Sequence, residues 1–242
     1  DKWKTWPVIP TVDPSVREIY EYGQSLGNDP HAFSIFGDCQ TRPGEFFGVF
    51  ETNPAATQSL SPELREVVAY FDGSFNRESS TSQDGTTPGA LLWDQWHRGE
   101  YGCQFGETPV DCELRIHRPS FVIIQIGSHF ESRNTEYLRR VINQLLEQGV
   151  IPILATKADN LEGDNTINAT IARLAMEYGV PMWNYWQAVQ PLQDAGLQED
   201  QVHITWGPNR FDDPMVMKKG WPVRNLTALQ VLEAVWRFAS GS

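Results

Sequence analysis

The sequence predicts an α/β fold, a three-layer α/β/α sandwich around a central parallel sheet of the flavodoxin-like kind. Continuous apolar runs, typical of strands buried on both faces, stand at 121–127 and 150–156. Segments with apolar residues at helical spacing follow them at 134–148 and 164–179. Strands that alternate with helices are joined by right-handed crossovers, and these crossovers produce a parallel sheet covered on its faces by helices.

Three elements precede this alternation. A helix is expected to begin at Asp13-Pro14, an N-cap and first-turn pair, and to end near Gly27. The apolar run at 32–36 predicts a buried strand. A second helix is expected over 61–73, because its first residues are Ser-Pro with acidic residues in the first turn.

The remaining segments complete a single predicted domain over 1–242, in which 1–30 form an N-terminal extension and the first helix. Residues 74–118 are rich in Gly, Ser, Thr and Trp and predict a long irregular insertion with short helical turns. Such an insertion in a compact domain is more often functional than idle. A short strand is expected at 180–184 and a final helix at about 226–238.

Composition excludes several classes of protein. The 242 residues contain 19 Lys and Arg against 31 Asp and Glu, a formal net charge of −12. An acidic surface repels phosphate, so we expect no nucleic-acid partner. No apolar run approaches the length of a transmembrane helix. No cofactor is expected.

The cysteines suggest a compartment. Cys103 and Cys112 bracket a loop in which Gly106 and Pro109 can turn the chain back, so a local disulfide is favoured over two free thiols. A disulfide is typical of an oxidising compartment, and the chain is therefore expected to be secreted or extracytoplasmic, although no signal peptide is visible in the sequence. Cys39 is left unpaired.

Ligands of parallel α/β sheets bind outside the carboxyl ends of the strands, and polar residues follow the strands here. Cys39 follows the strand at 32–36, His129 follows the strand at 121–127, and Asp200 and His203 precede the final helix. A nucleophilic thiol needs a base, and the base needs a third group that fixes its tautomer.

This set has a chemical and a structural interpretation. Asp200 is close enough along the chain for its carboxylate to reach Nδ1 of His203. Cys39 at a strand-to-helix turn would receive partial positive charge from the helix N-terminus, which lowers the pKa of a thiol, whereas the neighbouring Asp38 would raise it. The alternatives are a solvated surface pair for Asp200 and His203, and a small core residue for Cys39.

Two blocks of the sequence carry a resemblance to a known family. Residues 36–41, Phe-Gly-Asp-Cys-Gln-Thr, are similar to the Gly-Asp-Ser block that follows the first strand of the SGNH, or GDSL-type, hydrolase superfamily. Residues 200–205 match its Asp-x-x-His block before the last helix. In order and spacing, the chain resembles this superfamily over about 32–238.

The resemblance implies an esterase-like fold and a set of roles. Cys39 would be the nucleophile in the place of Ser, His203 the base, and Asp200 the residue that orients His203. Backbone N–H groups of the nucleophile and of a second block, for which Ser79 is our choice, would hold the oxyanion. His129 stands where the family has an oxyanion Asn. Asp38, beside the nucleophile, is grouped with these oxyanion and substrate-binding residues.

The departures from the family pattern leave two functions to weigh. The first is an acyl-ester hydrolase or an acyltransferase that uses a Cys-His-Asp triad on a small-molecule or carbohydrate ester. A carbohydrate O-deacetylase is one such hydrolase. Displacement of the attacking atom by the longer C–S bond can lower the rate by about two orders of magnitude. The alternative is therefore a weak or inactive relative that binds a ligand such as a saccharide. A zinc site formed by Cys39, His129 and His203 is less favoured, and we predict no metal.

Overall fold

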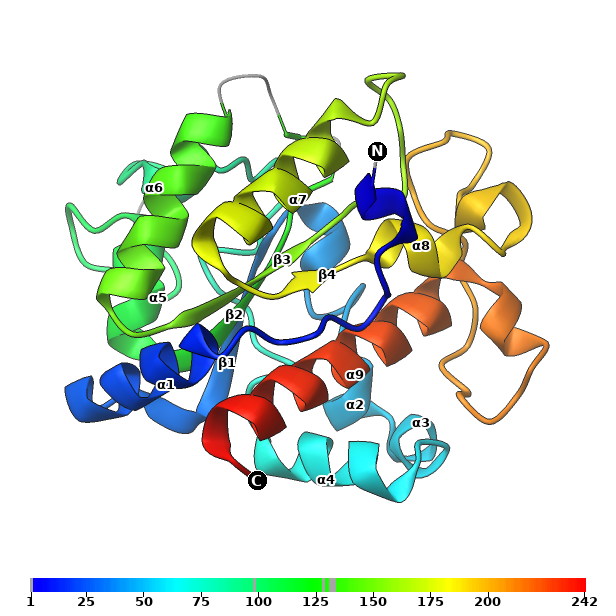
Figure 1. The fold of residues 1–242 in the computed structure, drawn as a ribbon, viewed down its shortest axis with the longest axis horizontal. Helices are drawn as coiled ribbons and strands as arrows, with labels where there is room; N and C mark the ends of the chain where they lie inside the picture. The colour runs from blue at the N-terminus through cyan, green and yellow to red at the C-terminus, as the bar shows by residue number, and fades with distance from the viewer. Residues whose placement is uncertain (1, 98, 128, 131–133) are drawn as a thin grey trace.

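The sheet of the computed structural model, which describes residues 2–97, 99–127, 129–130 and 134–242, is parallel throughout. Its four strands lie in the order β1-β2-β3-β4 (Figure 1). They are β1 (Asp29–Gly37), β2 (Pro119–Gln125), β3 (Ile151–Ala155) and β4 (Met182–Trp183). Helices lie on both faces of the sheet, so the predicted three-layer α/β/α sandwich with a central parallel sheet is confirmed.

The position of β2 and β3 in the middle of the sheet explains why their sequences are mainly apolar. Every residue of β2 and β3 is buried. Phe121 and Ile123 of β2 belong to the core on one face, whereas Val122 and Ile124 belong to the core on the other. Because successive side chains of a strand point to opposite faces, a strand covered on both sides is mainly apolar, and in β2 the polar residues Ser120 and Gln125 lie near its two ends.

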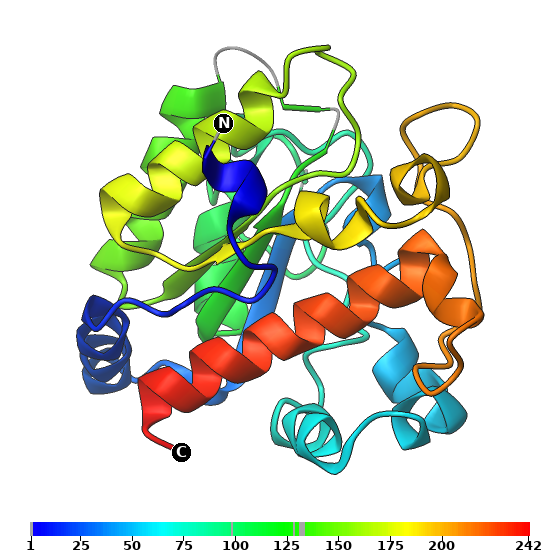
Figure 2. The same cartoon turned by 45° about the vertical axis from the view of Figure 1, so that its right-hand side comes forward.

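The helices divide between the two faces (Figures 1 and 2). One core is shared by α1 (Ser15–Leu26), α4 (Pro62–Tyr70) and α9 (Gly220–Ser240). The other core is shared by α5 (Pro109–Ile116), α6 (Asn134–Glu147) and α7 (Thr166–Tyr178). The described ranges also contain three short α-helices: α2 (Val49–Thr52), α3 (Pro54–Gln58) and α8 (Tyr185–Val189).

Several predicted boundaries differ from the structure: β1 begins at Asp29 rather than at 32, and α4 ends at Tyr70 rather than near Gly73. The final helix begins at Gly220 rather than at 226, because Pro222 lies in the first turn, where the missing N–H is not needed. The strand predicted at 180–184 is reduced to the two residues of β4. The earlier start of α9 matters for the site, because it places a further turn of helix against the sheet.

The insertion at 74–118 is partly helical. Its last part is α5, which starts with Pro109 in the first turn and a reciprocal capping box between Thr108 and Asp111. The structure contains the disulfide between Cys103 and Cys112, with Cα atoms 5.2 Å apart, which ties α5 to the loop before it.

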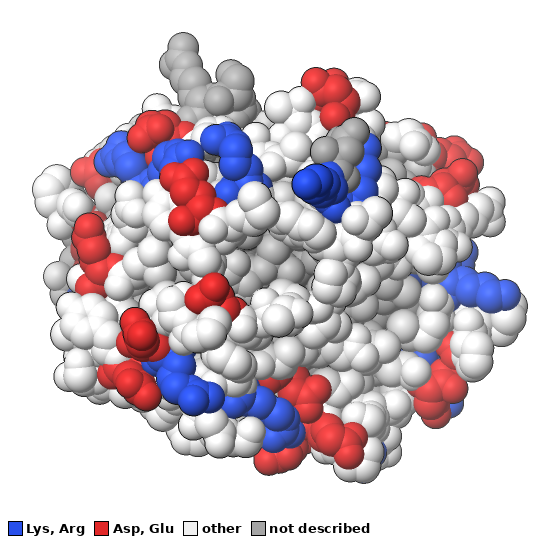
Figure 3. All heavy atoms as spheres, in the orientation of Figure 1, with Lys and Arg blue, Asp and Glu red and all other residues white. Residues whose placement is uncertain are grey.

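Surface charge and helix composition bear on the partners that the protein can have. On the face shown in Figure 3, basic side chains lie among acidic ones and do not gather into one patch. Within the described ranges, none of the helices is both long and apolar enough to cross a membrane.

Candidate functional site

The turn that carries Cys39 starts with a close approach of backbone. A Cβ on Gly37, the last residue of β1, would lie 2.4 Å from Oγ1 of Thr41 and 2.5 Å from the carbonyl oxygen of Gln125 in β2. A side chain at position 37 would therefore displace the turn. Glycine lets the chain fold back at once, and Cys39 becomes the first residue of a 3-10 turn, η2 (Cys39–Thr41).

Asp38 holds this turn against the neighbouring strand. Its carboxylate is 2 % exposed. Oδ1 accepts a hydrogen bond from the backbone N–H of Gln40 at 3.1 Å, and Oδ2 accepts one from the N–H of Gly127 at 2.9 Å. Asp38 thus joins the ends of β1 and β2, and its predicted contact with substrate stays a prediction.

Asp200 and His203 form a compact pair in the loop before α9. Oδ2 of Asp200 lies 2.6 Å from Nδ1 of His203, and Oδ1 accepts hydrogen bonds from the backbone N–H groups of Val202 and His203 at 3.0 and 2.9 Å. The hydrogen bond with His203 is the largest of the effects that lower the pKa of Asp200 to about 2. The two side chains are 47 % and 52 % exposed, so the pair lies at the surface.

Cys39 and His203 line one hollow of about 470 Å³. Cys39 is half-buried. The residues that line the hollow are Cys39, Gln40, Arg42, Gly44, Glu45, Glu78, Asp84 and His203. No hydrogen bond joins Sγ of Cys39 to His203 in the part of the chain that the structure describes. The two side chains share a space that a substrate could enter.

The rim of this hollow is mainly acidic. Glu45, Glu78 and Asp84 contribute three carboxylates, against the single guanidinium of Arg42. Arg42 pairs with both Glu78 and Asp84 at 3.4 Å. One cation for three anions leaves a negative potential at the entrance, which disfavours anionic ligands.

The environment of Cys39 favours the neutral thiol. Burial is the largest cause that raises the pKa of Cys39, and the charges of Asp38 and Asp84 raise it further. Hydrogen bonds from the backbone N–H groups of Gln40 and Cys39 act in the opposite direction. Reaction at this thiol would therefore need a base that removes the proton during attack, because a preformed thiolate is disfavoured.

The two remaining predicted oxyanion residues are not among the described residues that line the hollow. His129 follows β2, is half-buried, and accepts a hydrogen bond at its carbonyl from Nδ2 of Asn134 at 3.1 Å. Ser79 is buried, and its Oγ lies 3.0 Å from Oγ1 of Thr81. The roles of His129 and Ser79 at an oxyanion stay predictions.

Metal-ligating side chains come together elsewhere. Of the residues that the structure describes, Cys103, Glu107 and Cys112 have ligand atoms within 4.8 Å of one another, and the two sulfurs are bonded to each other. Cys39, His129 and His203 do not form such a group.

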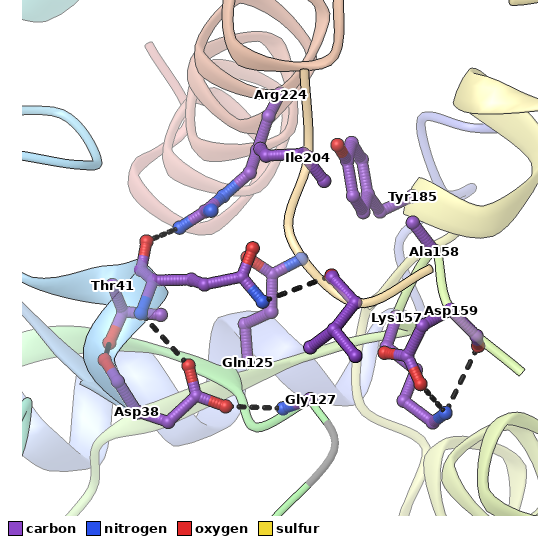
Figure 4. A pocket seen from close by; sticks show the side chains of 12 residues that line it. Asp38, Thr41, Gln125, Gly127, Lys157, Ala158, Asp159, Tyr185, Ile204 and Arg224 are labelled. Carbon is purple, nitrogen blue, oxygen red and sulfur yellow. Dashed lines mark hydrogen bonds and ion pairs between the residues drawn. The ribbon is translucent and has the colours of Figure 1, made fainter. Parts of the chain in front are cut away.

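A set of buried polar residues that the sequence did not single out lies beside the turn that holds Asp38 and Thr41 (Figure 4). They surround a cavity of about 20 Å³ and include Gln125, Lys157, Asp159 and Arg224. Lys157 is paired, since its Nζ lies 2.5 Å from Oδ1 of Asp159. Oε1 of Gln125 and Nε of Arg224 are buried with no hydrogen-bond partner in the described structure. No sequence pattern marks Gln125 or Arg224, because their hydrogen bonds, to Thr156 and to Gln40, join segments far apart in the chain.

Comparison with known proteins gives similarity at the level of structure and none at the level of sequence. No family model matches the chain, and no curated protein matches its sequence. A GDSL-like lipase from Bacteroides thetaiotaomicron VPI-5482 has a similar structure, with a TM-score of 0.44 and 13 % sequence identity over 95 % of this chain and 99 % of that chain. The fold and the site together define an α/β protein with a half-buried thiol and an Asp–His pair beside a parallel sheet.

Proposed function

We propose that the chain is an acyl-ester hydrolase or acyltransferase in which Cys39, His203 and Asp200 act together. The observation that carries the proposal is the shared hollow: Cys39 and His203 line it, and Asp200 holds Nδ1 of His203 at 2.6 Å. Nδ1 is occupied by the carboxylate, so Nε2 is the nitrogen left to exchange a proton with Cys39.

The reaction has two halves. In the first, His203 takes the proton of Cys39 as Sγ attacks the ester carbonyl carbon, the C–O bond to the alcohol breaks, and His203 returns the proton to the alcohol oxygen. In the second, water or another alcohol attacks the thioester, His203 accepts its proton, and the proton returns to Sγ as the thiol leaves. The N–H groups of Cys39 and Gln40, which favour negative charge at Sγ, support a place for the oxyanion near this turn.

A second hollow supports a carbohydrate ester as the substrate. It measures about 530 Å³ and contains four amide side chains, Asn160, Asn165, Gln190 and Gln201, together with Trp186. Amides both donate and accept hydrogen bonds, as the hydroxyl groups of a neutral sugar require, and an indole offers an apolar face. Gln201 lies in the same loop as His203, so a sugar bound here would adjoin the proposed catalytic pair.

The disulfide supports a secreted or extracytoplasmic location, because such bonds persist in oxidising compartments.

A non-catalytic ligand-binding protein is the second candidate. Two observations favour it: the raised pKa of Cys39, and the lack of a hydrogen bond between Cys39 and His203 among the described contacts. A cleft kept for binding needs neither a reactive thiol nor a preformed contact with the base.

Hydrolysis of p-nitrophenyl acetate and release of acetate from acetylated xylo-oligosaccharides test the proposal. The parent chain is compared with Cys39→Ala, Cys39→Ser and His203→Gln, with and without a chelator, and with His31→Gln, which changes an exposed histidine of β1. We expect turnover by the parent and by His31→Gln, loss in Cys39→Ala and His203→Gln, and no effect of the chelator. Equal rates in the parent and in Cys39→Ala would remove the proposal and favour the binding protein.

A further inference from the structure

Arg224 is a buried cation next to the proposed nucleophile. It lies on the second turn of α9 and is 3 % exposed. In Figure 4 it points from α9 toward the turn that holds Asp38 and Thr41. Its Nη2 donates a hydrogen bond to the carbonyl oxygen of Gln40, the residue after Cys39.

The guanidinium is held without a carboxylate. Its central carbon lies 4.4 Å from the centre of the Phe46 ring, a cation–π contact. Throughout the described ranges no ion pair reaches Arg224, and its Nε has no hydrogen-bond partner. A buried, unpaired charge destabilises a fold, and an apolar side chain of similar volume would stabilise it more. The charge therefore points to a role other than packing.

We propose that Arg224 is a positioning residue for Cys39: it fixes the nucleophile turn through the Gln40 carbonyl and keeps a permanent positive charge within electrostatic reach of the thiol. This inference rests on the proposed function, in which Cys39 is the attacking group.

The charge balance around the thiol explains why a cation is useful there. Asp38 and Asp84 both disfavour a thiolate at Cys39. Burial lowers the pKa of Arg224, and the charges of Tyr185, Asp38, Glu45 and Cys39 oppose this effect, so the guanidinium lies within electrostatic reach of the turn. Arginine stays protonated even when buried, and it therefore supplies a charge that does not vary with pH.

The same contact also aligns the two halves of the proposed triad. Arg224 holds the carbonyl of Gln40, and Nε2 of Gln40 donates to the carbonyl of Val202 at 3.4 Å. Val202 immediately precedes His203. A shift of the Gln40 peptide would thus move Cys39 relative to His203.

The test uses alkylation of Cys39 by iodoacetamide, which needs no ester turnover. Cys39 is the free cysteine of the chain, since the other two are bonded. Arg224→Gln keeps a donor for the Gln40 carbonyl but removes the charge, and Arg224→Lys keeps the charge. We expect the alkylation rate at pH 8 to fall about tenfold in Arg224→Gln, a shift of one pH unit in the thiol titration, and to stay within about threefold of the parent in Arg224→Lys.

A matched control is available on the same helix. Arg237 also lies over an aromatic ring, Trp236, at 4.9 Å, and it pairs with Glu66 and Glu233 away from the hollow. Arg237→Gln should lower stability and leave the pH profile of alkylation unchanged. If Arg224→Gln does not fold, Arg224→Met, which fills the same space without charge, takes its place.

The outcomes separate this proposal from the proposed function. Parent-like alkylation profiles in both uncharged variants, or a Lys variant as slow as the Gln variant, would overturn the role of Arg224, whatever the ester assay gives. Slower alkylation of Cys39 in Arg224→Gln, restored in Arg224→Lys, supports the role of Arg224 even if no ester is hydrolysed. The lack of ester hydrolysis would then exclude the proposed function alone. Where esters are hydrolysed, kcat should fall in Arg224→Gln with KM nearly unchanged, because the residue acts through Cys39.

Discussion

The side-chain amide of Gln40 donates a hydrogen bond to the carbonyl oxygen of Val202 at 3.4 Å, across 162 positions of sequence. Gln40 directly follows Cys39, and Val202 directly precedes His203. This contact therefore connects the turn after β1 with the loop before α9. At 3.4 Å it is a long hydrogen bond, so it adds little stability, and its main effect is on the relative position of the two loops.

Replacement of Gln40 should affect turnover more than stability. Gln40→Leu keeps the size of the side chain and loses the donor to Val202. We expect kcat for p-nitrophenyl acetate to fall about tenfold, because small displacements of reacting groups lower rates strongly. Gln24→Leu is the control, since Gln24 donates to Oγ of Ser120 far from the hollow. Equal kcat values for the two variants would count against the alignment role.

Loss of the Asp200 charge should disable His203 as a base. In Asp200→Asn the side chain no longer favours the tautomer with hydrogen on Nδ1, so Nε2 is less often free to accept a proton. We expect kcat/KM to fall by at least about a hundredfold while the unfolding midpoint changes little, because the pair is exposed. Asp212→Asn, which breaks the exposed Asp212–Arg210 pair, is the matched control. Turnover that survives in Asp200→Asn would exclude the triad.

Local patterns in the sequence predicted much of the fold and part of the site. The buried strands were predictable because both faces of β2 and β3 are covered, which favours mainly apolar runs. The contact between Asp200 and His203 spans three residues, and the disulfide spans nine, so each is a local property of the chain.

The supporting contacts were not predictable in this way. Arg224 reaches Gln40 across 184 residues, and nothing near Arg224 in the sequence distinguishes it from an exposed helical arginine. The prediction of a start at 226 for the last helix also left position 224 outside that helix. The placements of His129 and Ser79 depend on how the loops after β2 and before α5 fold, which hydrophobic periodicity does not determine.

The pH dependence of Cys39 follows from its raised pKa. Iodoacetamide reacts with the thiolate, so the rate should keep rising with pH from 7 to 9 and show no plateau below pH 8. Burial and the Asp38 and Asp84 charges are the cause, so Asp84→Asn should shift the profile to lower pH. A rate that levels off below pH 8 would instead indicate a preformed thiolate–imidazolium pair with His203.

The disulfide should stabilise the fold without affecting the hollow. Cys103 and Cys112 close a loop with a sequence separation of nine, and neither residue lines the hollow around Cys39. The double variant Cys103→Ser/Cys112→Ser should lose about 2 to 3 kcal/mol in the free energy of unfolding, measured in urea, and keep its ester turnover. A reducing agent should lower the stability of the parent to the same extent and leave the variant unchanged. Stability that does not respond to the reducing agent would argue against the bond.

His117 should make the free energy of unfolding depend on pH, in a pH range above that in which carboxylates titrate. Burial is the largest cause that lowers its pKa, and the charge of Arg77 adds to it. In the unfolded chain His117 binds a proton near pH 6.5, whereas in the folded chain it stays neutral to a lower pH. The free energy of unfolding is therefore highest above about pH 6.5 and decreases as the pH falls toward the pKa of His117 in the folded chain.

The slope from this one group is at most about 1.4 kcal/mol per pH unit. Urea unfolding at pH 7.5 and 5.5 measures it, and His117→Gln should flatten the difference. Nε2 of His117 lies 3.1 Å from Oγ of Ser74, so Ser74→Ala is the matched control: it removes a contact but keeps the titrating ring. It should lower stability at both pH values and preserve the slope. An unchanged slope in His117→Gln would assign the pH dependence to other groups.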